Sequence, residues 1–165
     1  MSTPRPAGFR SSRWLWWPVL LLLGGLVLGL LITMSPPPVL GPVGDRLQPC
    51  PNSPNCVCSD DPASTHAIAP LPCPGPGTAT SELARLRSLV LARPRTRLLE
   101  ERRDYLRFEV TTAWFRFRDD LEFLADDAGR IIHVRSASRV GHSDLGTNRR
   151  RIEEIRAQFA SVNHP

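Results

Sequence analysis

The apolar residues near the start of the chain form one uninterrupted run. The segment WLWWPVLLLLGGLVLGLLITM, residues 14–34, contains no charged residue. A helix of this length is about 31 Å long at 1.5 Å per residue, which is enough to cross the hydrocarbon core of a bilayer. Three tryptophans cluster at its first turn, as in an interfacial aromatic belt. The pattern predicts one N-terminal transmembrane helix with the lipid bilayer as its partner.

The residues on either side of this run predict its orientation. Three arginines and no acid precede it, whereas the first charges after it are Asp45 and Arg46. The positive-inside rule therefore predicts a cytoplasmic basic tail over 1–13 and a Pro/Gly-rich tether over 35–49 outside the cytoplasm. A cleaved signal peptide is the alternative, but its apolar region is normally ~7–15 residues and ends at a small-residue cleavage site. We expect a single-pass protein of the bacterial inner membrane with a periplasmic C-terminal domain.

From residue 80 onward the apolar pattern becomes periodic. Leu83, Leu86, Leu89 and Val90 have helical spacing, and Ile152, Ile155 and Phe159 repeat that spacing near the end. Between them, strand-like alternation predicts strands over 97–101, 104–112, 114–124 and 130–136, with a turn or bulge at Asp119 and Asp120. The pattern predicts an α+β domain over 50–160, an antiparallel meander of about four strands with a helix before and after it.

The net charge of +5 could indicate nucleic-acid binding, but the distribution of the charge argues against it. Three of the 21 arginines precede the apolar run, and the remainder of the chain balances 18 arginines against 16 acids. An aromatic platform for single-stranded nucleic acid or sugar is the other interpretation of the Phe and Trp residues around 108–123. Their alternation favours core positions, with Trp114 as the exception. We therefore expect no nucleic-acid partner.

All four cysteines lie within residues 50–73, in the part that we expect to be exported. An even number of cysteines in an oxidising compartment favours two disulfides. A bond between Cys56 and Cys58 would close a strained ring, and the turn-forming residues between Cys50 and Cys56 favour pairing of those two. We predict Cys50–Cys56 together with Cys58–Cys73. The alternatives are a metal site and a redox pair at Cys56 and Cys58. The spacing fits no zinc pattern, and nothing nearby marks either thiol as having a low pKa, so we expect neither a metal nor another cofactor.

The stretch SASRVGHSDLGTNRRR, residues 136–151, is almost entirely polar and leads into the last helix. Unpaired backbone N–H groups at a helix start favour anions, and arginines at 135, 139, 149 and 150 can bind carboxylate or phosphate. The sequence therefore predicts a candidate anion site over 135–151. The alternative is that Asp144 itself occupies the helix start or pairs with Arg139, so that the loop satisfies its own polar groups.

Serine, histidine and aspartate in this stretch also raise the alternative of a hydrolase. The consecutive side chains of His142, Ser143 and Asp144 point apart and cannot form a relay with one another. A catalytic triad would need Ser136 or Ser138 to meet His133 or His142 and a further acid in space. The sequence permits that arrangement without indicating it.

Three segments resemble the family of domains of unknown function 1499: CPNSPNCV (50–57), FRFRDDLEF (115–123) and SASRVGHSDLGTNRRRIEEIR (136–156). The resemblance covers roughly residues 47–160. It implies the Cys50–Cys56 bond and directs attention to Gly141, Gly146 and the motif side chains, but it implies no reaction. The candidate ligand-binding residues are Ser136, Ser138, Arg139, Asp144, Asn148, Arg149 and Arg151. We predict a binding or envelope-interaction module for an anionic envelope component, with a hydrolase of a cell-envelope substrate as the alternative.

Overall fold

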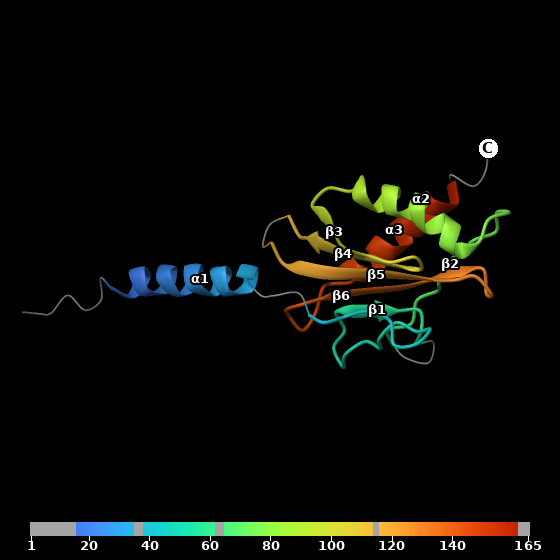
Figure 1. Ribbon diagram of the computed structural model, residues 1–165. Coiled ribbons are helices and arrows are strands. Elements are labelled where there is room, and N and C mark those ends of the chain that lie inside the picture. Colours follow the sequence, from blue (N-terminus) through green and yellow to red (C-terminus); the bar gives the residue numbers. More distant parts are fainter. Residues whose placement is uncertain (1–15, 35–37, 62–64, 114–115, 162–165) are drawn as a thin grey trace, which may run out of the picture. The chain divides into compact units, whose positions relative to one another are not determined.

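The computed structural model describes residues 16–34, 38–61, 65–113 and 116–161 (Figure 1). The chain forms two compact units, Met1–Pro36 and Pro37–Pro165. The first unit contains helix α1, Trp17–Met34, and the second contains every other described helix and strand. Trp114, singled out from the sequence, lies outside the described residues.

The structure of helix α1 differs from the first prediction, that of a transmembrane helix. None of the described helices is both long enough and apolar enough to span a membrane, so the transmembrane helix predicted over 14–34 is not supported. The described helix has 18 residues.

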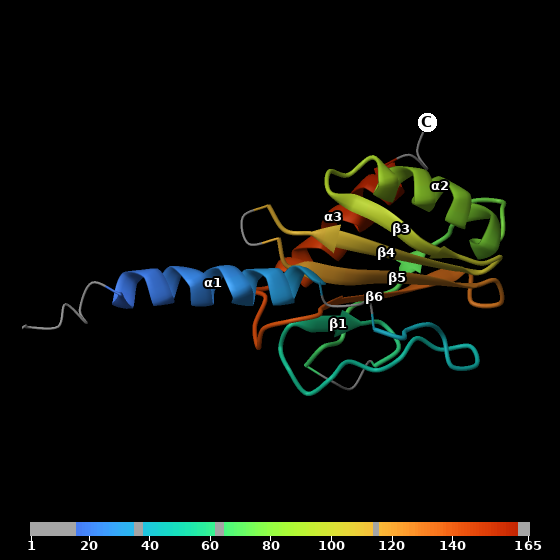
Figure 2. The same cartoon turned by 60° about the vertical axis from the view of Figure 1, so that its left-hand side comes forward.

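The second unit is built on one antiparallel sheet in the order β1-β6-β5-β4-β3, with β2 also paired to β6 (Figures 1 and 2). Helices α2, Ala79–Leu91, and α3, Thr147–Ser161, lie on one face of the sheet. Among the described residues the sheet has six strands, so the predicted number of about four is wrong. Strands β1 and β2 span three and two residues, too few to show an alternating pattern. The strands are β1 (Cys56–Cys58), β2 (Leu71–Pro72), β3 (Thr96–Glu101), β4 (Tyr105–Thr111), β5 (Arg118–Asp126) and β6 (Ile131–Ser138).

The helix-covered face of the sheet holds the main hydrophobic core. Residues at helical spacing in α2 and α3 meet alternate residues of the central strands, and all of them are buried. Phe108 and Phe123 pack edge to face with ring centroids 6.0 Å apart. Aromatic pairs in this geometry contribute beyond the area that they bury. The core includes Leu83, Leu86, Val90, Leu106, Phe108, Leu121, Phe123, Ile132, Val134, Ile152, Ile155 and Phe159.

The start of β5 corrects the predicted turn at Asp119 and Asp120. Both aspartates lie inside the strand, and each is only 1% exposed. Successive strand residues point to opposite faces, so the two carboxylates reach different arginines. Asp119 pairs with Arg151 of α3, whereas Asp120 pairs with arginines on the opposite face. Partners distant in the chain therefore allow an acidic pair to stay in the middle of a sheet.

The opposite face of the sheet carries a layer of buried charges, which we call the charged layer: Arg107, Glu109, Asp120, Glu122, Arg135 and Arg139. Their side chains are at most 8% exposed. Arg107 and Arg139 both bind Asp120, Arg139 also binds Glu109, and Arg135 binds Glu122 at 2.7 Å. Tyr105 donates to Glu122 at 2.7 Å, and burial together with that carboxylate raises the pKa of the phenol. Buried charges are tolerated when they are paired and hydrogen-bonded in this way.

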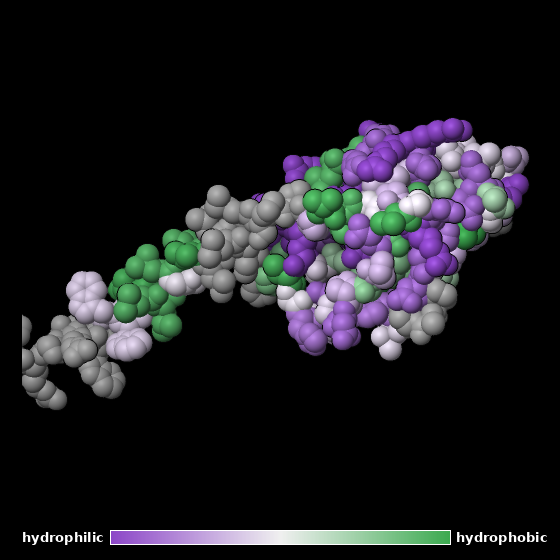
Figure 3. Space-filling view, turned by 60° about the horizontal axis from the view of Figure 1, so that its bottom comes forward, coloured by the Kyte–Doolittle hydropathy of each residue, from purple (hydrophilic) through white to green (hydrophobic). Residues whose placement is uncertain are grey.

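The segment over residues 38–60 covers part of the charged layer. Arg107 donates to the Pro38 carbonyl at 2.8 Å, and buried Leu47 packs with Tyr105 and Leu124. The side of the domain turned forward in Figure 3 is mainly hydrophilic, with separate apolar patches. This cover therefore shields the charges without presenting a broad apolar surface on that side.

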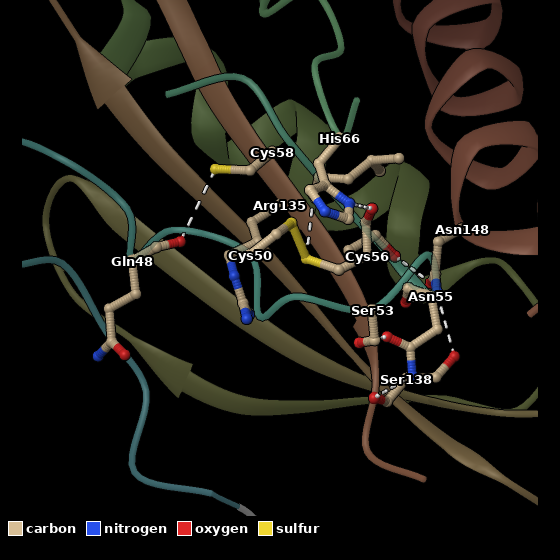
Figure 4. The surroundings of a disulfide bond; sticks show 12 residues. Gln48, Cys50, Ser53, Asn55, Cys56, Cys58, His66, Arg135, Ser138 and Asn148 are labelled. Atoms are coloured by element: carbon tan, nitrogen blue, oxygen red, sulfur yellow. Dashed lines mark hydrogen bonds between the residues drawn. A yellow bond between two sulfur atoms is a disulfide. The ribbon is translucent and has the colours of Figure 1, made fainter. Parts of the chain in front are cut away.

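The cysteines form one disulfide, between Cys50 and Cys56 (Figure 4). This bond confirms the first predicted pair. Cys58 and Cys73 are buried free thiols, so the second predicted bond is wrong. The sheet separates them: Cys58 packs with Leu47 and Tyr105 on the charged side, whereas Cys73 belongs to the core beneath the helices.

Candidate functional site

The predicted anion position at the start of α3 is occupied by the chain itself. The Asp144 carboxylate accepts from the backbone N–H of Gly146 at 3.0 Å and from that of Asn148 at 2.6 Å. A carboxylate in this place satisfies the unpaired N–H groups and interacts favourably with the helix dipole. Asp144 thus acts as the N-terminal cap of the helix.

Asn148 is the centre of the polar corner behind that cap. Its Oδ1 accepts from Ser136 at 2.6 Å, and its Nδ2 donates to the Asn55 carbonyl at 2.9 Å and to Ser138 at 3.1 Å. Asn55, which belongs to the disulfide loop, lies next to Ser138 in Figure 4. The side chain of Asn148 therefore connects α3, β6 and the loop before β1.

The arginines of the predicted site also have partners within the protein. Arg139 binds Asp120 through two nitrogens at 2.8 and 2.9 Å and Glu109 at 2.8 Å. The mutual pairing raises the pKa of its guanidinium, although burial opposes this. Arg151 donates to Ser136, Asn148 and Asp119, and Arg149 donates to the Ala67 carbonyl. The structure places Arg139 on the charged face of the sheet and Arg151 on the face covered by the helices. The polar groups of these arginines are used in internal contacts, as the second interpretation of this loop expected.

The triad considered from the sequence is not assembled around Ser136 or Ser138. Both serines belong to the side of β6 that meets α3, through their contacts with Asn148. His133 lies on the same strand but contacts Asp60. Because successive strand residues alternate between faces, a serine at 136 or 138 and a histidine at 133 point to opposite sides of the sheet.

A different constellation lies at the other end of β6, where His133 pairs with Asp60. The Nδ1 atom of His133 is 2.5 Å from Oδ1 of Asp60, and Oδ2 of Asp60 accepts from the Leu47 N–H at 2.7 Å. The side chains are 17% and 5% exposed. A histidine held through Nδ1 by a carboxylate has a fixed ring orientation, and Nε2 remains for a ligand or a proton.

Ser59 supports this pair without completing a triad. Its Oγ lies 3.4 Å from the same Nδ1 and accepts from the Val134 N–H at 2.9 Å. A nucleophilic serine would instead have to meet Nε2. Ser59 therefore fixes the position of the ring, and Nε2 of His133 has no hydrogen-bonding partner among the described residues.

This pair lines a cavity of about 800 Å³, which we call the Asp60 cavity. Its walls come from the loop at 43–46, the segment before β4, the end of β5 and the turn that follows. Five carboxylates face two guanidiniums in the lining: Asp45, Asp60, Asp104, Asp126 and Asp127 against Arg46 and Arg103. The volume is within the usual range of small-molecule sites.

Two of these carboxylates are held by local contacts. Asp126 accepts from the Gly129 N–H at 2.9 Å, which orders the turn between β5 and β6. Asp127 accepts from the backbone N–H of Thr80 at 2.7 Å, and this bond is the main reason that the pKa of Asp127 is lowered. The lowered pKa favours the ionised form of Asp127 at the edge of the cavity. No group of three or more metal-ligating side chains is found in the part of the chain that the structure describes.

Sequence reasoning named His133 only as one of two candidate histidines and did not name Asp60. The two residues are far apart in the chain, and no local spacing links them. They meet because β1 pairs antiparallel with β6, with Cys58 opposite Arg135. The histidine two residues before Arg135 then lies near the aspartate two residues after Cys58.

Comparison with known proteins assigns the family. The model of a family described as a protein of unknown function, DUF1499, matches residues 46–159, which is more than half of the chain. The chain belongs to the DUF1499 family. The matched residues of this DUF1499 member include the Asp60–His133 pair, the charged layer and the polar corner around Asn148. No curated protein and no solved structure matches the chain.

Proposed function

We propose that this DUF1499 domain is a binding module that takes a small polar ligand in the Asp60 cavity. The observation that carries the proposal is the partly buried Asp60–His133 pair in the wall of a cavity of about 800 Å³. Pre-ordered polar side chains in a cavity of this size are typical of ligand sites. The corner at residues 136–151 has the opposite character, because its side chains already bind one another.

The charge of the lining indicates the ligand class. Five carboxylates against two guanidiniums favour a ligand that carries a cationic group. Nε2 of His133 adds one directed hydrogen bond, since Nδ1 is already committed to Asp60. A polyhydroxylated molecule with an ammonium group, such as an amino sugar, satisfies both requirements.

We also propose that the domain functions in an oxidising compartment outside the cytoplasm. The Cys50–Cys56 disulfide supports this location, because such bonds persist where thiols are not kept reduced. An amino-sugar ligand is consistent with a role in the cell envelope. The location is tested by isolating the protein from cells after an acid quench, which stops thiol exchange, and measuring whether the Cys50–Cys56 bond is present.

The ligand experiment compares two probes of matched size. Glucosamine and glucose, which differ in one ammonium group, are titrated into the full-length chain while backbone amide signals of residues 124–128 are followed by NMR. Glucosamine should produce saturable shifts that glucose does not. Loss of one hydrogen bond in His133→Asn should weaken the apparent affinity about fivefold.

The matched control for this titration is His142→Asn, which changes an exposed histidine outside the cavity. Its glucosamine affinity should equal that of the unmodified chain. The proposal fails if glucosamine shifts none of these amides, or if His133→Asn binds as well as His142→Asn does.

A second candidate, hydrolysis of an envelope ester, is favoured by the same dyad. In such a step Nε2 of His133 takes a proton from water, the hydroxide oxygen bonds to the ester carbonyl carbon, and the ester C–O bond breaks as the proton passes to the leaving oxygen. The Asp60 carboxylate orients the ring through Nδ1. This candidate requires that p-nitrophenyl acetate hydrolysis above the solution background disappear in His133→Asn and persist in His142→Asn.

A further inference from the structure

A second concave site lies at the opposite end of the central strands. The Asp60 cavity is lined by residues just before β4 begins, whereas this second site is lined by residues where β4 ends. We call it the arginine groove, and its volume is about 300 Å³. Its lining consists of Arg95, Thr96, Arg97, Glu109, Thr111, Thr112, Ala113 and Arg116.

The arginine groove has a strong excess of positive charge. Among the described residues that line it, Glu109 is the sole acid, against three arginines. The Glu109 carboxylate is already shared: Arg139 binds it at 2.8 Å, Arg97 at 3.2 Å, and Arg118 lies 3.8 Å away. One negative charge therefore cannot neutralise the groove, and its field attracts anions.

Two of the three arginines retain donors that the described residues do not use. Arg95 donates through Nε to the Thr111 carbonyl at 3.2 Å, which leaves its terminal nitrogens available. Arg116 is exposed and has no partner among the described residues. Guanidinium forks of this kind match the oxygens of a phosphate group.

The backbone at these two positions gives an independent indication. Arg95 has φ 57° and Arg116 has φ 54°, in the left-handed region where glycine or asparagine is usual. Arginine thus occupies two positions, in separate turns, where the backbone conformation is unfavourable for it. Both positions border the same groove. Strained residues of this kind cluster at ligand sites.

Two other residues with the same backbone conformation show the contrast. Arg130, with φ 52°, donates to the carbonyls of Cys73 and Gly75, so its side chain has an internal structural use. Leu145, with φ 54°, is 85% exposed and lies outside the groove. Arg95 and Arg116 differ from both in placing cationic donors around a concave surface.

We infer that the arginine groove is a binding site for a phosphate group. The predicted anion-binding arginine at 139 contributes indirectly: it neutralises Glu109 from the buried side and leaves the exposed arginines to a ligand. Phosphate monoesters, inorganic phosphate and the phosphodiester of a lipid headgroup share this chemistry. This site does not depend on the ligand of the Asp60 cavity.

The test is a titration of the full-length chain at constant ionic strength, followed through the arginine Nε–H signals by NMR. Inorganic phosphate should shift the Arg95 and Arg116 signals saturably, and chloride should not. Glycerophosphoglycerol, the water-soluble headgroup of phosphatidylglycerol, forms the second arm. Tighter binding of the diester assigns the site to lipid headgroups, and tighter binding of inorganic phosphate assigns it to free phosphate.

Substitution by glycine separates a binding role from a structural role. Arg116→Gly and Arg95→Gly relieve the left-handed backbone, so the melting temperature should stay the same or rise, while the phosphate affinity should fall roughly fivefold. Arg116→Lys should recover part of the affinity because it keeps the charge. Leu145→Gly is the matched control, with the same backbone relief and unchanged phosphate binding.

Either of two results overturns the inference. The first is the absence of saturable phosphate-induced shifts at Arg95 and Arg116 in the unmodified chain. The second is an Arg116→Gly variant that binds phosphate as tightly as Leu145→Gly does. If both glycine variants proved unfolded, the unmodified chain's own response to phosphate against chloride would still decide the question.

Discussion

The two faces of the sheet are both buried, but by different means. Beneath the helices, Phe108 and Leu121 occupy opposed positions on β4 and β5 and pack in an apolar core. On the other face, the neighbouring residues Arg107 and Asp120 bind each other at 2.8 Å with side chains 7% and 2% exposed. Apolar burial is tolerant of approximate geometry, whereas buried charges are stable only with matched partners.

This difference teaches that alternation along a strand does not identify the solvent side. In β4 the polar residues alternate with the apolar residues, as in a strand with one wet face. In this protein the polar face is instead partly covered by the segment over 38–60, and its charges are paired with one another. Stability on that face should therefore be lost by removing one charge, and on the other by removing volume.

The largest effect should follow removal of the acid that two arginines share. Asp120→Ala leaves Arg107 and Arg139 without their common acceptor, and breaking a buried pair in this way costs about 3–5 kcal/mol. Urea unfolding followed by circular dichroism measures the loss. Glu101→Ala is the control, since its pair with Arg87 is 49% and 38% exposed and should contribute less than ~1 kcal/mol. Equal costs for the two variants would show that the charged layer contributes nothing special.

The next largest loss of stability should follow a change at Leu121, which is adjacent to Asp120 and faces the apolar core. Leu121→Ala removes fully buried volume from the core and should cost about 3 kcal/mol. The same unfolding measurement applies. Ala84→Gly, at an exposed position of α2, controls for general fragility and should cost only about 1 kcal/mol. A Leu121→Ala loss no greater than that of the control would contradict the view that this face is held by packing.

A smaller effect is expected where the two kinds of burial meet, at the polar corner. Asn148→Ala deprives Ser136 and Arg151 of an acceptor and the Asn55 carbonyl of its donor. The unmade bonds should cost about 2 kcal/mol. Arg150→Ala, which removes only exposed contacts, should stay within ~0.5 kcal/mol of the unmodified chain. Differential scanning calorimetry of the two variants decides whether the corner is structural.

The smallest expected effect on stability comes from the two buried thiols, Cys58 on the charged face and Cys73 in the apolar core, and it appears only at high pH. Burial raises the pKa of Cys58 and raises that of Cys73 to about 11. The folded state therefore favours the protonated thiols, and this stabilisation is complete below the unfolded pKa near 9.0 and is lost as the pH rises from there through about 11. The urea midpoint should fall over that window, and less steeply in Cys73→Ala.

Thiol counting checks the same assignment directly. At pH 8 iodoacetamide should modify the native chain slowly, because both thiols are buried and protonated. After unfolding in urea without reductant, two thiols per chain should react. A count of zero would mean that Cys58 and Cys73 are bonded and that the sheet does not separate them.

The parts of the fold that follow from local spacing were predictable from the sequence. The apolar stripe at Leu83, Leu86 and Val90 is the buried side of α2, and Ile152, Ile155 and Phe159 are the buried side of α3. The alternation of Leu106, Phe108 and Val110 with their polar neighbours assigned the faces of β4. In each case the period of the apolar residues is itself the signal.

The features that depend on distant partners were not predictable. Asp119 and Asp120 indicate a turn by their local propensity, and only arginines elsewhere in the fold keep them inside β5. The Asp60–His133 pair likewise exists because β1 docks on β6. The arginine groove combines the turns that precede β3 and β5, and only the fold places those turns side by side.

The position of Cys58 in β1 has a consequence for how the chain matures. Cys50, Cys56 and Cys58 lie within nine positions, so thiol–disulfide exchange can join Cys50 to either neighbour while the segment is unfolded. Pairing of β1 with β6 buries Cys58 opposite Arg135 and withdraws it from that competition. Because β6 follows the cysteines in the chain, Cys58 stays accessible to this exchange until the last strand pairs with β1.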